Sequence, residues 1–261
     1  MEKVHKSIFI TGAAAGIGRA TAQHFAAAGW RVGLYDINLA GVTALAGELG
    51  SAAVAGQLDV TNAEAFADAL ANFAAGAEGR LDVLFNNAGV LATGDFESLP
   101  LARCHQLIDI NNKGVVNGCH AALPYLKAAQ GAVINMASAS SIYGTPAFAV
   151  YSASKFFVRG LTEALNIEWA RQGVYVCDVS PLFVDTPMVA AVTDKPKSVS
   201  ALGVRLSAQD IAAIVYQAAT CSRWCAPVHW LPGAQAKLLA LLNKLSPWRM
   251  ARASTKLISG Y

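Results

Sequence analysis

Tyr151 and Lys155 stand four residues apart and form the pair whose types and spacing point most directly to chemistry. On a helix, positions i and i+4 share one face, so the phenol and the ammonium group would be neighbours. A phenol with the ordinary pKa of about 10 is a weak base at neutral pH, and a nearby positive charge favours the phenolate. The pair could therefore move a proton to or from an alcohol oxygen. Because the same spacing is common on helix surfaces, this interpretation needs a cofactor site beside it.

A glycine-rich turn near the start of the chain predicts a dinucleotide site. An apolar run at 7–11 leads into the segment Thr11-Gly12-Ala13-Ala14-Ala15-Gly16-Ile17-Gly18. Glycine permits a positive φ and a close approach of the backbone to a diphosphate, and the N-terminus of the following helix attracts that anion. The expected cofactor contacts in this turn are Gly12, Ala14, Gly16, Ile17 and Gly18.

Asp36 lies 18 residues after the last glycine of this turn, at the end of the second expected strand. A carboxylate at that place accepts hydrogen bonds from the hydroxyls of the adenosine ribose and repels a 2′-phosphate. The glycine turn holds no basic residue that could pair with such a phosphate. The sequence therefore favours NAD(H) over NADP(H), with an ordinary helix-capping aspartate as the alternative interpretation of Asp36.

These residues need a scaffold, and the hydrophobic pattern predicts alternating strands and helices. The expected strands are 7–11, 31–35, 52–57, 81–85, 132–136 and 174–179, and the expected helices are roughly 16–28, 38–49, 62–76, 101–128 and 152–171. Continuous apolar strands between helices indicate a parallel sheet covered on both faces. Right-handed crossovers make such a sheet doubly wound, with its binding crevice at the carboxyl ends of the strands. Later in the chain we expect an irregular stretch at 186–206, a helix near 207–221 and a short strand near 226–230.

The bulk composition fits one folded α/β domain of this doubly wound, Rossmann-type class over residues 1–233, with a helical tail after it. The chain has 261 residues, 54% hydrophobic and 14% charged, which excludes a disordered chain. The longest charge-free stretch, 128–154, contains a proline and several polar residues, so we expect neither a membrane span nor a signal peptide. Five scattered cysteines predict free thiols in a cytoplasmic protein without a metal site, and no basic stripe predicts nucleic-acid binding.

The order and spacing of these motifs resemble the short-chain dehydrogenases/reductases over about residues 5–232. The landmarks are the Gly-x3-Gly-x-Gly turn, Asp59-Val60, Asn86-Asn87-Ala88-Gly89, Asn111, Ser138, and Tyr151-Ser152-Ala153-Ser154-Lys155. The resemblance implies an oxidoreductase that transfers a hydride between nicotinamide and an alcohol or ketone. It also implies a homodimer or a homotetramer, formed through the long helices at 101–128 and 152–171.

The resemblance assigns roles to individual residues. In the catalytic set, Tyr151 is the general acid/base, Ser138 bonds the same substrate oxygen, Lys155 holds the nicotinamide ribose and Asn111 positions a water that links Lys155 to solvent. The remaining cofactor contacts are Asp59 and Val60 at the adenine edge, Asn86, Asn87 and Gly89 near the adenosine, and Pro181, Val184 and Thr186 at the nicotinamide amide. The family usually has glycine after that proline, whereas this chain has Leu182, which adds a side chain beside the nicotinamide site.

The expected substrate pocket is largely apolar. Its candidate residues are Val90, Ser140, Tyr143, Phe148, Leu182, Phe183 and Met188. We interpret the nearby cations Lys195, Lys197 and Arg205 as solvated loop residues. The sequence therefore predicts an uncharged, hydrophobic secondary alcohol or ketone as substrate. Reduction of an acyl-thioester or of a lipid or steroid ketone is an alternative, and so is a non-catalytic nucleotide-binding protein, although that class would be expected to lack Tyr151 or Lys155.

The tail, residues 234–261, is basic and amphipathic. It carries five basic residues and no acidic one, and its leucines at 238, 239, 241, 242 and 245 form a helical stripe that is followed by Trp248. One interpretation packs this extension over the substrate mouth or on a neighbouring subunit. The other places it on an anionic membrane surface, as a peripheral contact.

Overall fold

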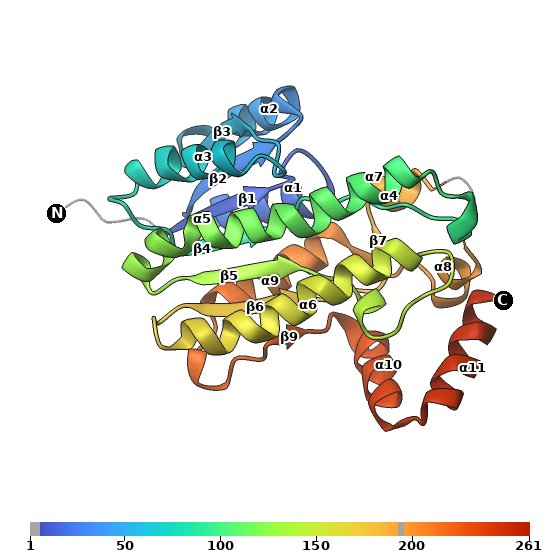
Figure 1. Ribbon diagram of the computed structural model, residues 1–261. Helices are drawn as coiled ribbons and strands as arrows, with labels where there is room; N and C mark the ends of the chain where they lie inside the picture. The colour runs from blue at the N-terminus through green and yellow to red at the C-terminus, as the bar shows by residue number, and fades with distance from the viewer. Residues whose placement is uncertain (1–5, 193–195) are drawn as a thin grey trace.

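The computed structural model describes residues 6–192 and 196–261, and its centre is a parallel sheet (Figure 1). The strands lie in the order β3-β2-β1-β4-β5-β6-β9. Their bounds are β1 (Ser7–Thr11), β2 (Arg31–Asp36), β3 (Ala53–Gln57), β4 (Val83–Asn86), β5 (Ala132–Met136), β6 (Tyr175–Val179) and β9 (His229–Trp230). The order reverses direction between β1 and β4, which makes the sheet doubly wound, and the predicted fold class is confirmed. The first six predicted strands hold to within two residues, with β2 extended to Asp36 and β4 begun at Val83, and the short strand expected near 226–230 is limited to His229–Trp230.

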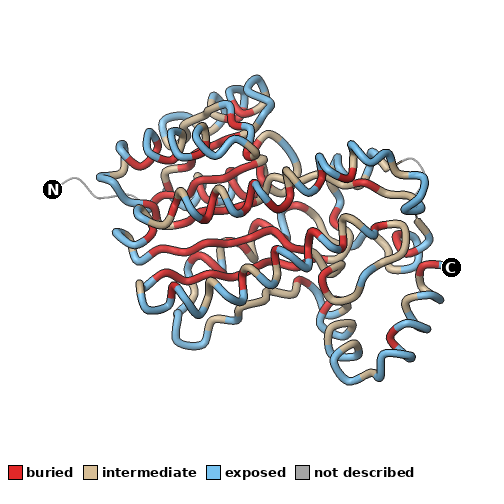
Figure 2. Tube along the Cα trace, viewed as in Figure 1, coloured by how far each residue is buried: buried red, intermediate tan, exposed pale blue. Residues whose placement is uncertain are grey.

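Helices cover both faces of the sheet. One face packs on α1 (Gly16–Ala27), α2 (Leu39–Leu49) and α9 (Ala208–Thr220). The opposite face packs on α3 (Ala63–Ala75), α5 (Gly114–Ala129) and α6 (Ala149–Ala170). Figure 2 shows the consequence, since the central strands are buried along their whole length. The alternation of side chains explains why continuous apolar strands are needed here: Ile8 and Ile10 fill one core, while Phe9 fills the other and stacks on Tyr35 at 4.1 Å between ring centroids.

The single helix expected at 101–128 is interrupted. It consists of α4 (Leu101–Ile108), a π-helical segment (Asp109–Lys113) and α5. Asn111 and Asn112 of the π segment are buried, and their side chains donate to Ser154 rather than pointing to solvent. π-helical segments often occur at functional sites, and this one lies against α6, next to the Tyr151 pair.

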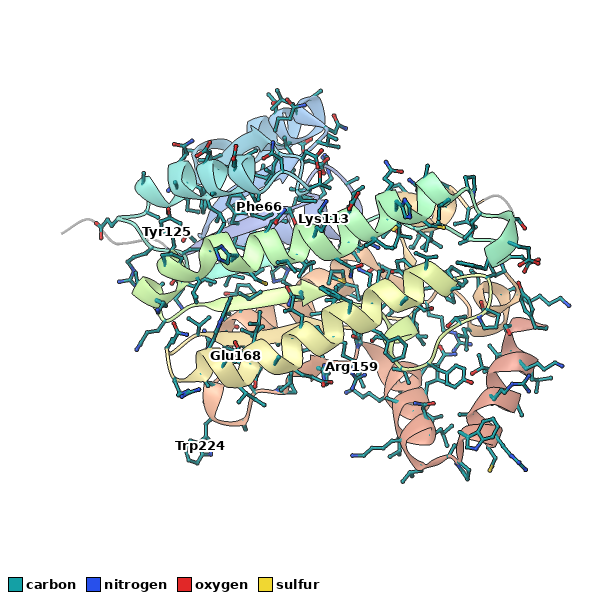
Figure 3. All side chains as sticks on the ribbon, viewed as in Figure 1. Phe66, Lys113, Tyr125, Arg159, Glu168 and Trp224 are labelled. Carbon is teal, nitrogen blue, oxygen red and sulfur yellow. The ribbon has the colours of Figure 1, made fainter. Side chains whose placement is uncertain are left out.

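The stretch expected to be irregular, 186–206, contains local structure. It holds α7 (Pro187–Ala190) and α8 (Lys197–Leu202), and β7 (Val184–Asp185) pairs with β8 (Leu206–Ser207). Pro187 suits the first turn of a helix because its fixed φ is already helical. Lys195, interpreted above as a loop cation, lies outside the described residues. Short 3-10 turns occur at Gly50–Ala52, Phe96–Ser98, Ala139–Ser141 and Arg223–Cys225, and the last of these projects Trp224 into solvent (Figure 3).

The tail forms a helical hairpin of α10 (Gly233–Leu245) and α11 (Trp248–Ser259). The second helix was not expected from the sequence. It packs on α8, and the side chain of Asn243 in α10 donates to the carbonyl of Ile142, so the hairpin lies against the body that carries Tyr151 (Figure 1). Leu238, Leu241 and Leu245 remain exposed on its outer side. Among the described helices, none is both long enough and apolar enough to cross a bilayer.

The glycine turn predicts a measurable packing effect. A Cβ at Gly18 would overlap the carbonyl oxygen of Gly12 and lie 2.7 Å from Nδ2 of Asn87, whereas a Cβ at Gly47 in α2 would meet open space. Alanine is ordinarily favoured over glycine inside a helix by about 1 kcal/mol. We therefore expect Gly47→Ala to raise the free energy of unfolding by about 0.5–1 kcal/mol, and Gly18→Ala to lower it by about 1–3 kcal/mol. Urea titration measures both, and equal effects of the two substitutions would contradict the close packing of this turn.

Candidate active site

A cavity of about 490 Å³ lies at the carboxyl ends of the strands and brings most of the predicted site residues together. It runs from the glycine turn past Tyr151 to the tail hairpin, as its lining residues show. The predicted residues that line it are Gly12, Gly16, Ile17, Asp36, Asn87, Gly89, Val90, Ser138, Ser140, Tyr143, Phe148, Tyr151, Lys155, Pro181, Leu182, Phe183, Val184, Thr186 and Met188.

The other predicted residues lie outside the cavity lining. The backbone N–H of Ala14 donates to Asp36 at 3.1 Å, and Gly18 packs on Gly12. Asp59 accepts hydrogen bonds from the backbone and the hydroxyl of Thr61, at 2.9 and 2.8 Å, and so fixes a turn. The structure does not bring these side chains into the cavity.

Val60, Asn86 and Asn111 are also buried outside the cavity lining. Val60 packs against the start of α5, where a Cβ on Gly114 would come within 2.7 Å of it. Asn86 donates to Asn135 inside the sheet at 2.9 Å. The Asn111 side-chain amide accepts from the Val90 N–H at 2.8 Å and donates to the Val90 carbonyl at 3.0 Å. This side chain therefore positions a residue of the pocket, and only the Asn111 backbone is left to bind the expected water.

Asp36 is held at the lip of the cavity. Its Oδ2 accepts from Ala14 N–H, and its Oδ1 accepts from Asn38 N–H at 2.9 Å. The cap of α2 is Asn38, whose side chain accepts from Gly41 N–H. Because another residue caps that helix, the alternative interpretation of Asp36 as an ordinary helix cap loses its support.

The crevice beside Asp36 fits a dinucleotide. Gly12 has φ +67°, and a Cβ there would come within 2.9 Å of Ala88 Cα, so the turn needs a residue without a side chain. The Thr11 hydroxyl accepts the backbone N–H groups of Asn87 and Ala88, both at 3.1 Å, and ties the ends of β1 and β4 together. The start of α1 then faces the cavity, where helix N–H groups favour an anion.

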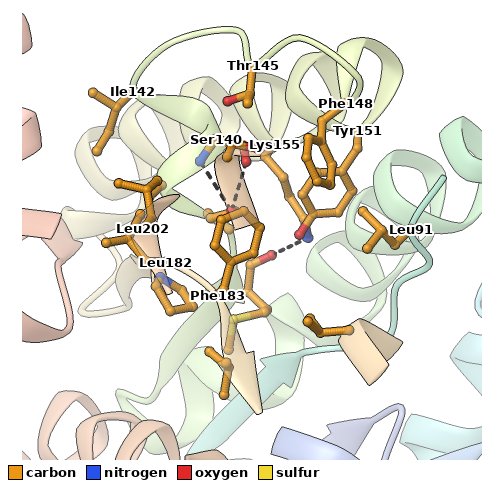
Figure 4. A pocket seen from close by; sticks show the side chains of 18 of the residues that line it. Leu91, Ser140, Ile142, Thr145, Phe148, Tyr151, Lys155, Leu182, Phe183 and Leu202 are labelled. Carbon is orange, nitrogen blue, oxygen red and sulfur yellow. Dashed lines mark hydrogen bonds between the residues drawn. The ribbon is translucent and has the colours of Figure 1, made fainter. Parts of the chain in front are cut away.

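The catalytic candidates converge in the middle of the cavity (Figure 4). Tyr151 and Lys155 lie on α6, and Ser138 follows β5. The Tyr151 hydroxyl is hydrogen-bonded with Ser138. The ammonium of Lys155 lies 5.5 Å from the centroid of the Tyr151 ring and donates to the carbonyl of Met136 at 2.7 Å. The arrangement places a proton carrier, a hydroxyl partner and a positive charge around one point.

Burial governs the protonation of this pair. It raises the pKa of Tyr151 to about 12, although the hydrogen bond with Ser138 acts in the opposite direction. It lowers the pKa of Lys155 to about 8, against the charge of Asp178, which raises it. The Tyr151 pKa therefore lies above its ordinary value, because desolvation outweighs the effect of Ser138. The lowering expected from the Lys155 charge together with that of an oxidised nicotinamide stays a prediction for the complex with the dinucleotide.

The end of the cavity beyond Tyr151 carries apolar and uncharged polar side chains, some of which sequence reasoning missed. Phe148 lies between Phe183 and Tyr151, with ring centroids 6.0 and 6.4 Å away. Leu239 and Leu242 of the predicted leucine stripe line this end, and the residues missed in the tail are Asn243, Ser246, Ala251, Ser254, Thr255, Ile258 and Ser259. Positions 251, 254, 255 and 258 follow the i, i+3, i+4, i+7 pattern of one helix face, which is the signal that could have identified α11.

In the described part of the chain, no group of three or more His, Cys, Asp or Glu side chains could hold a metal ion. All five cysteines are free thiols.

Comparison with known proteins gives a consistent picture. A model of the short chain dehydrogenase family matches residues 6–197. D-threitol dehydrogenase of Mycolicibacterium smegmatis is 37% identical over 200 residues, which cover 74% of this chain and 75% of the relative. The 3-alpha-(or 20-beta)-hydroxysteroid dehydrogenase of Mycobacterium tuberculosis is 36% identical over 186 residues, or 71% of either chain.

Solved structures agree. A 3-ketoacyl-(acyl-carrier-protein) reductase from Brucella melitensis complexed with NADH superposes with a TM-score of 0.78 at 26% identity, covering 88% of this chain and 97% of the other. Another matching structure has NADP bound, so these likenesses favour neither dinucleotide.

The match to the family model extends over most of the chain, and relatives above 30% identity span about three quarters of it. Their names describe dehydrogenases of alcohols and hydroxysteroids. Together with the fold and the crevice described above, this settles the family and its general chemistry. The chain belongs to the short-chain dehydrogenase family and is an oxidoreductase that uses a nicotinamide dinucleotide.

Proposed function

We propose that this protein is an NAD(H)-dependent oxidoreductase that interconverts a hydrophobic, uncharged secondary alcohol and its ketone, with Tyr151 as the general acid/base. The observation that carries the proposal is the cavity itself. Among its described lining residues, Asp36 and Lys155 are the only charged ones, and they lie at the predicted ribose sites rather than along the substrate wall. A substrate carboxylate or phosphate would find no cation of its own there.

The chain's residues divide the work as follows. The nicotinamide, when bound, accepts or donates a hydride. The Ser138 and Tyr151 hydroxyls hold the substrate oxygen, and Tyr151 gives that oxygen a proton during reduction or takes its proton during oxidation. Since burial raises the pKa of Tyr151 to about 12, the phenol is protonated at neutral pH and is ready to donate. The Lys155 ammonium stabilises the phenolate that remains after donation.

The preference for NAD(H) rests on the charge and fixed position of Asp36. Two backbone N–H groups orient the carboxylate at the lip of the cavity. A ribose with free hydroxyls can donate to it, whereas a 2′-phosphate would face a like charge. Leu182, in place of the usual glycine, lines the cavity and adds apolar surface on the substrate side.

A lipid or steroid ketone is the alternative substrate within this class. Two observations favour it over an acyl-thioester: the apolar cavity continues as far as the α10–α11 hairpin, and one of the relatives is a hydroxysteroid dehydrogenase. We further propose that residues 234–261 act as an extension of the same domain that closes the substrate end. The protein would work as a homodimer or homotetramer in the cytoplasm, where its five free thiols would stay reduced.

Removing the Tyr151 hydroxyl tests the general acid/base assignment. We expect Tyr151→Phe to lower kcat by about 10²–10⁴-fold, because proton transfer loses its carrier. NADH affinity, measured by fluorescence titration, should stay nearly unchanged, because the phenol contributes little to holding the dinucleotide. Tyr143→Phe is the matched control, since Tyr143 lines the same cavity and should keep most of the activity. Near wild-type turnover in Tyr151→Phe would remove this residue from the mechanism.

The Asp36 assignment is tested by cofactor selectivity. We expect the wild-type protein to prefer NADH, and Asp36→Asn to reduce the ratio of kcat/KM for NADH to that for NADPH by at least about tenfold, because roughly 1.4 kcal/mol of charge discrimination is lost. Asp59→Asn should leave the ratio unchanged, because Asp59 only fixes a turn outside the cavity. A wild-type preference for NADPH would show that the assignment is wrong.

The apolar wall predicts how rate depends on substrate. Across a series of methyl ketones with longer alkyl chains, kcat/KM should rise about three- to fourfold per added methylene until the cavity is filled, since each buried methylene is worth about 0.8 kcal/mol. Steady-state assays with NADH give the series, and sugars and keto acids of similar size serve as controls. Preference for a polyol or an anionic substrate would contradict the proposed substrate class.

A further inference from the structure

A row of polar side chains crosses the sheet near the carboxyl ends of its central strands, close to the catalytic residues. Asn86, Asn135, Asp178 and His229 occupy paired positions on the adjacent strands β4, β5, β6 and β9. In a parallel sheet, residues in register point to the same face. That face is covered by α6, because Asn135 donates to Thr162 at 2.9 Å and His229 contacts Glu163 of the same helix. The mechanism described above uses neither Asp178 nor His229.

Asp178 is a carboxylate with no exposed surface. Its Oδ1 accepts a hydrogen bond from the Ser180 hydroxyl at 2.7 Å, and its Oδ2 lies 2.5 Å from Nδ1 of His229. Burying a charged carboxylate costs several kcal/mol unless partners compensate for the lost water. Neighbouring groups must therefore compensate for the burial of the Asp178 carboxylate, and its charge must act on other groups nearby.

His229 explains how the carboxylate is held. Its second ring nitrogen, Nε2, lies 3.0 Å from Oε1 of Glu163. Each ring nitrogen of His229 therefore lies within hydrogen-bond distance of a carboxylate oxygen, one from Asp178 and one from Glu163. Glu163 pairs in turn with Arg159 at 3.1 Å, and both line a surface groove with Lys244 of α10. The contacts clamp the edge strand β9 to α6 and fix the Asp178 carboxylate.

The group on which Asp178 acts is Lys155. Lys155 lies on α6 seven residues before Thr162, and hence on the same side of the helix. Its ammonium donates to Met136, which follows Asn135 on β5. Lys155 is 5% exposed, and Asp178 supplies the charge that counteracts the lowering of its pKa by burial. The other charged groups near the row are Glu163, which contacts His229, and Arg159, which pairs with Glu163, while Lys244 of α10 lines the same groove as these two.

We propose that Asp178, held in place by His229 and Ser180, is a positioning residue that keeps the buried Lys155 ammonium charged so that it can stabilise the Tyr151 phenolate. The inference rests on the proposed roles of Tyr151 and Lys155 and extends them to residues that touch neither substrate nor cofactor. It gives His229 an indirect part, because its ring contacts Asp178 and does not itself line the cavity.

The test measures the charge of Lys155 without any substrate. Acetic anhydride reacts only with the neutral amine, and mass spectrometry of the Lys155 peptide gives its acetylation rate relative to exposed Lys113. Asp178→Asn keeps the shape but removes the charge. If the Lys155 pKa falls from about 8 by about one unit, acetylation at pH 6 becomes about tenfold faster. Glu163→Gln is the matched control, since it removes a carboxylate from the outer end of the same cluster but leaves Asp178 with its His229 and Ser180 contacts, and it should not accelerate acetylation.

The pH profile of ketone reduction provides a second readout. Both proteins hold a charged Lys155 at pH 6, so Asp178→Asn should then turn over at close to the wild-type rate, and at pH 9 it should be about tenfold slower. A purely structural role would lower activity equally at every pH. Thermal melting monitors folding, and Asp178→Ser is the second charge-free variant if the asparagine variant does not fold.

Unchanged acetylation of Lys155 in the charge-free variant would overturn the inference, whatever the activity shows. Equal acceleration by Glu163→Gln would also overturn it, because the loss of any carboxylate from the cluster, and not of Asp178 in particular, would then be decisive. If acetylation responds as expected but the wild-type protein reduces no ketone, the proposed function fails while the control of Lys155 by Asp178 stands.

Discussion

Two titratable side chains, Tyr151 and Lys155, share one water-poor cavity, and the rest of the site is arranged around the cost of burying them. Burial drives each group toward its neutral form, raising the pKa of Tyr151 to about 12 and lowering that of Lys155 to about 8. Proton transfer needs the charged forms to be accessible. Ser138 acts against burial at the phenol, and Asp178 acts against it at the ammonium. The chemistry thus depends on a few polar groups that offset desolvation.

The fold supplies those groups because parallel strands end together. Met136 and Ser138 come from the end of β5 or just beyond it, and Asp178 from β6, while α6 crosses above them with the reacting pair. The π-helical segment adds a further constraint, because Asn111 fixes Val90 at the opposite wall of the cavity. The tail hairpin lines the far end of the cavity with Leu239, Leu242 and Ile258 together with small and uncharged polar side chains.

Much of this could be predicted from the sequence, because continuous apolar strands and glycine turns are local signals. The order of the motifs along the chain predicts that the main site residues meet at one edge of the sheet. These residues are Gly12, Asp36, Ser138, Tyr151 and Lys155, and all of them line the cavity. The π-helical segment could not be predicted, since its hydrophobic pattern does not differ from that of an α-helix. Helix α11 was not predicted from the sequence because its inner face consists of small and polar residues. The pairing of Asp178 with His229 depends on the register of an edge strand 51 residues away, which no local pattern encodes.

In the proposed mechanism, the Lys155 charge makes the buried phenol of Tyr151 easier to ionise. An ultraviolet titration of the NAD⁺-saturated protein measures this effect, with the Tyr151→Phe spectrum subtracted so that one phenol is followed. We expect the Tyr151 phenolate to form at a clearly higher pH in Lys155→Met than in the wild-type protein. Ionisation of Tyr151 at the same pH in both proteins would contradict this mechanism.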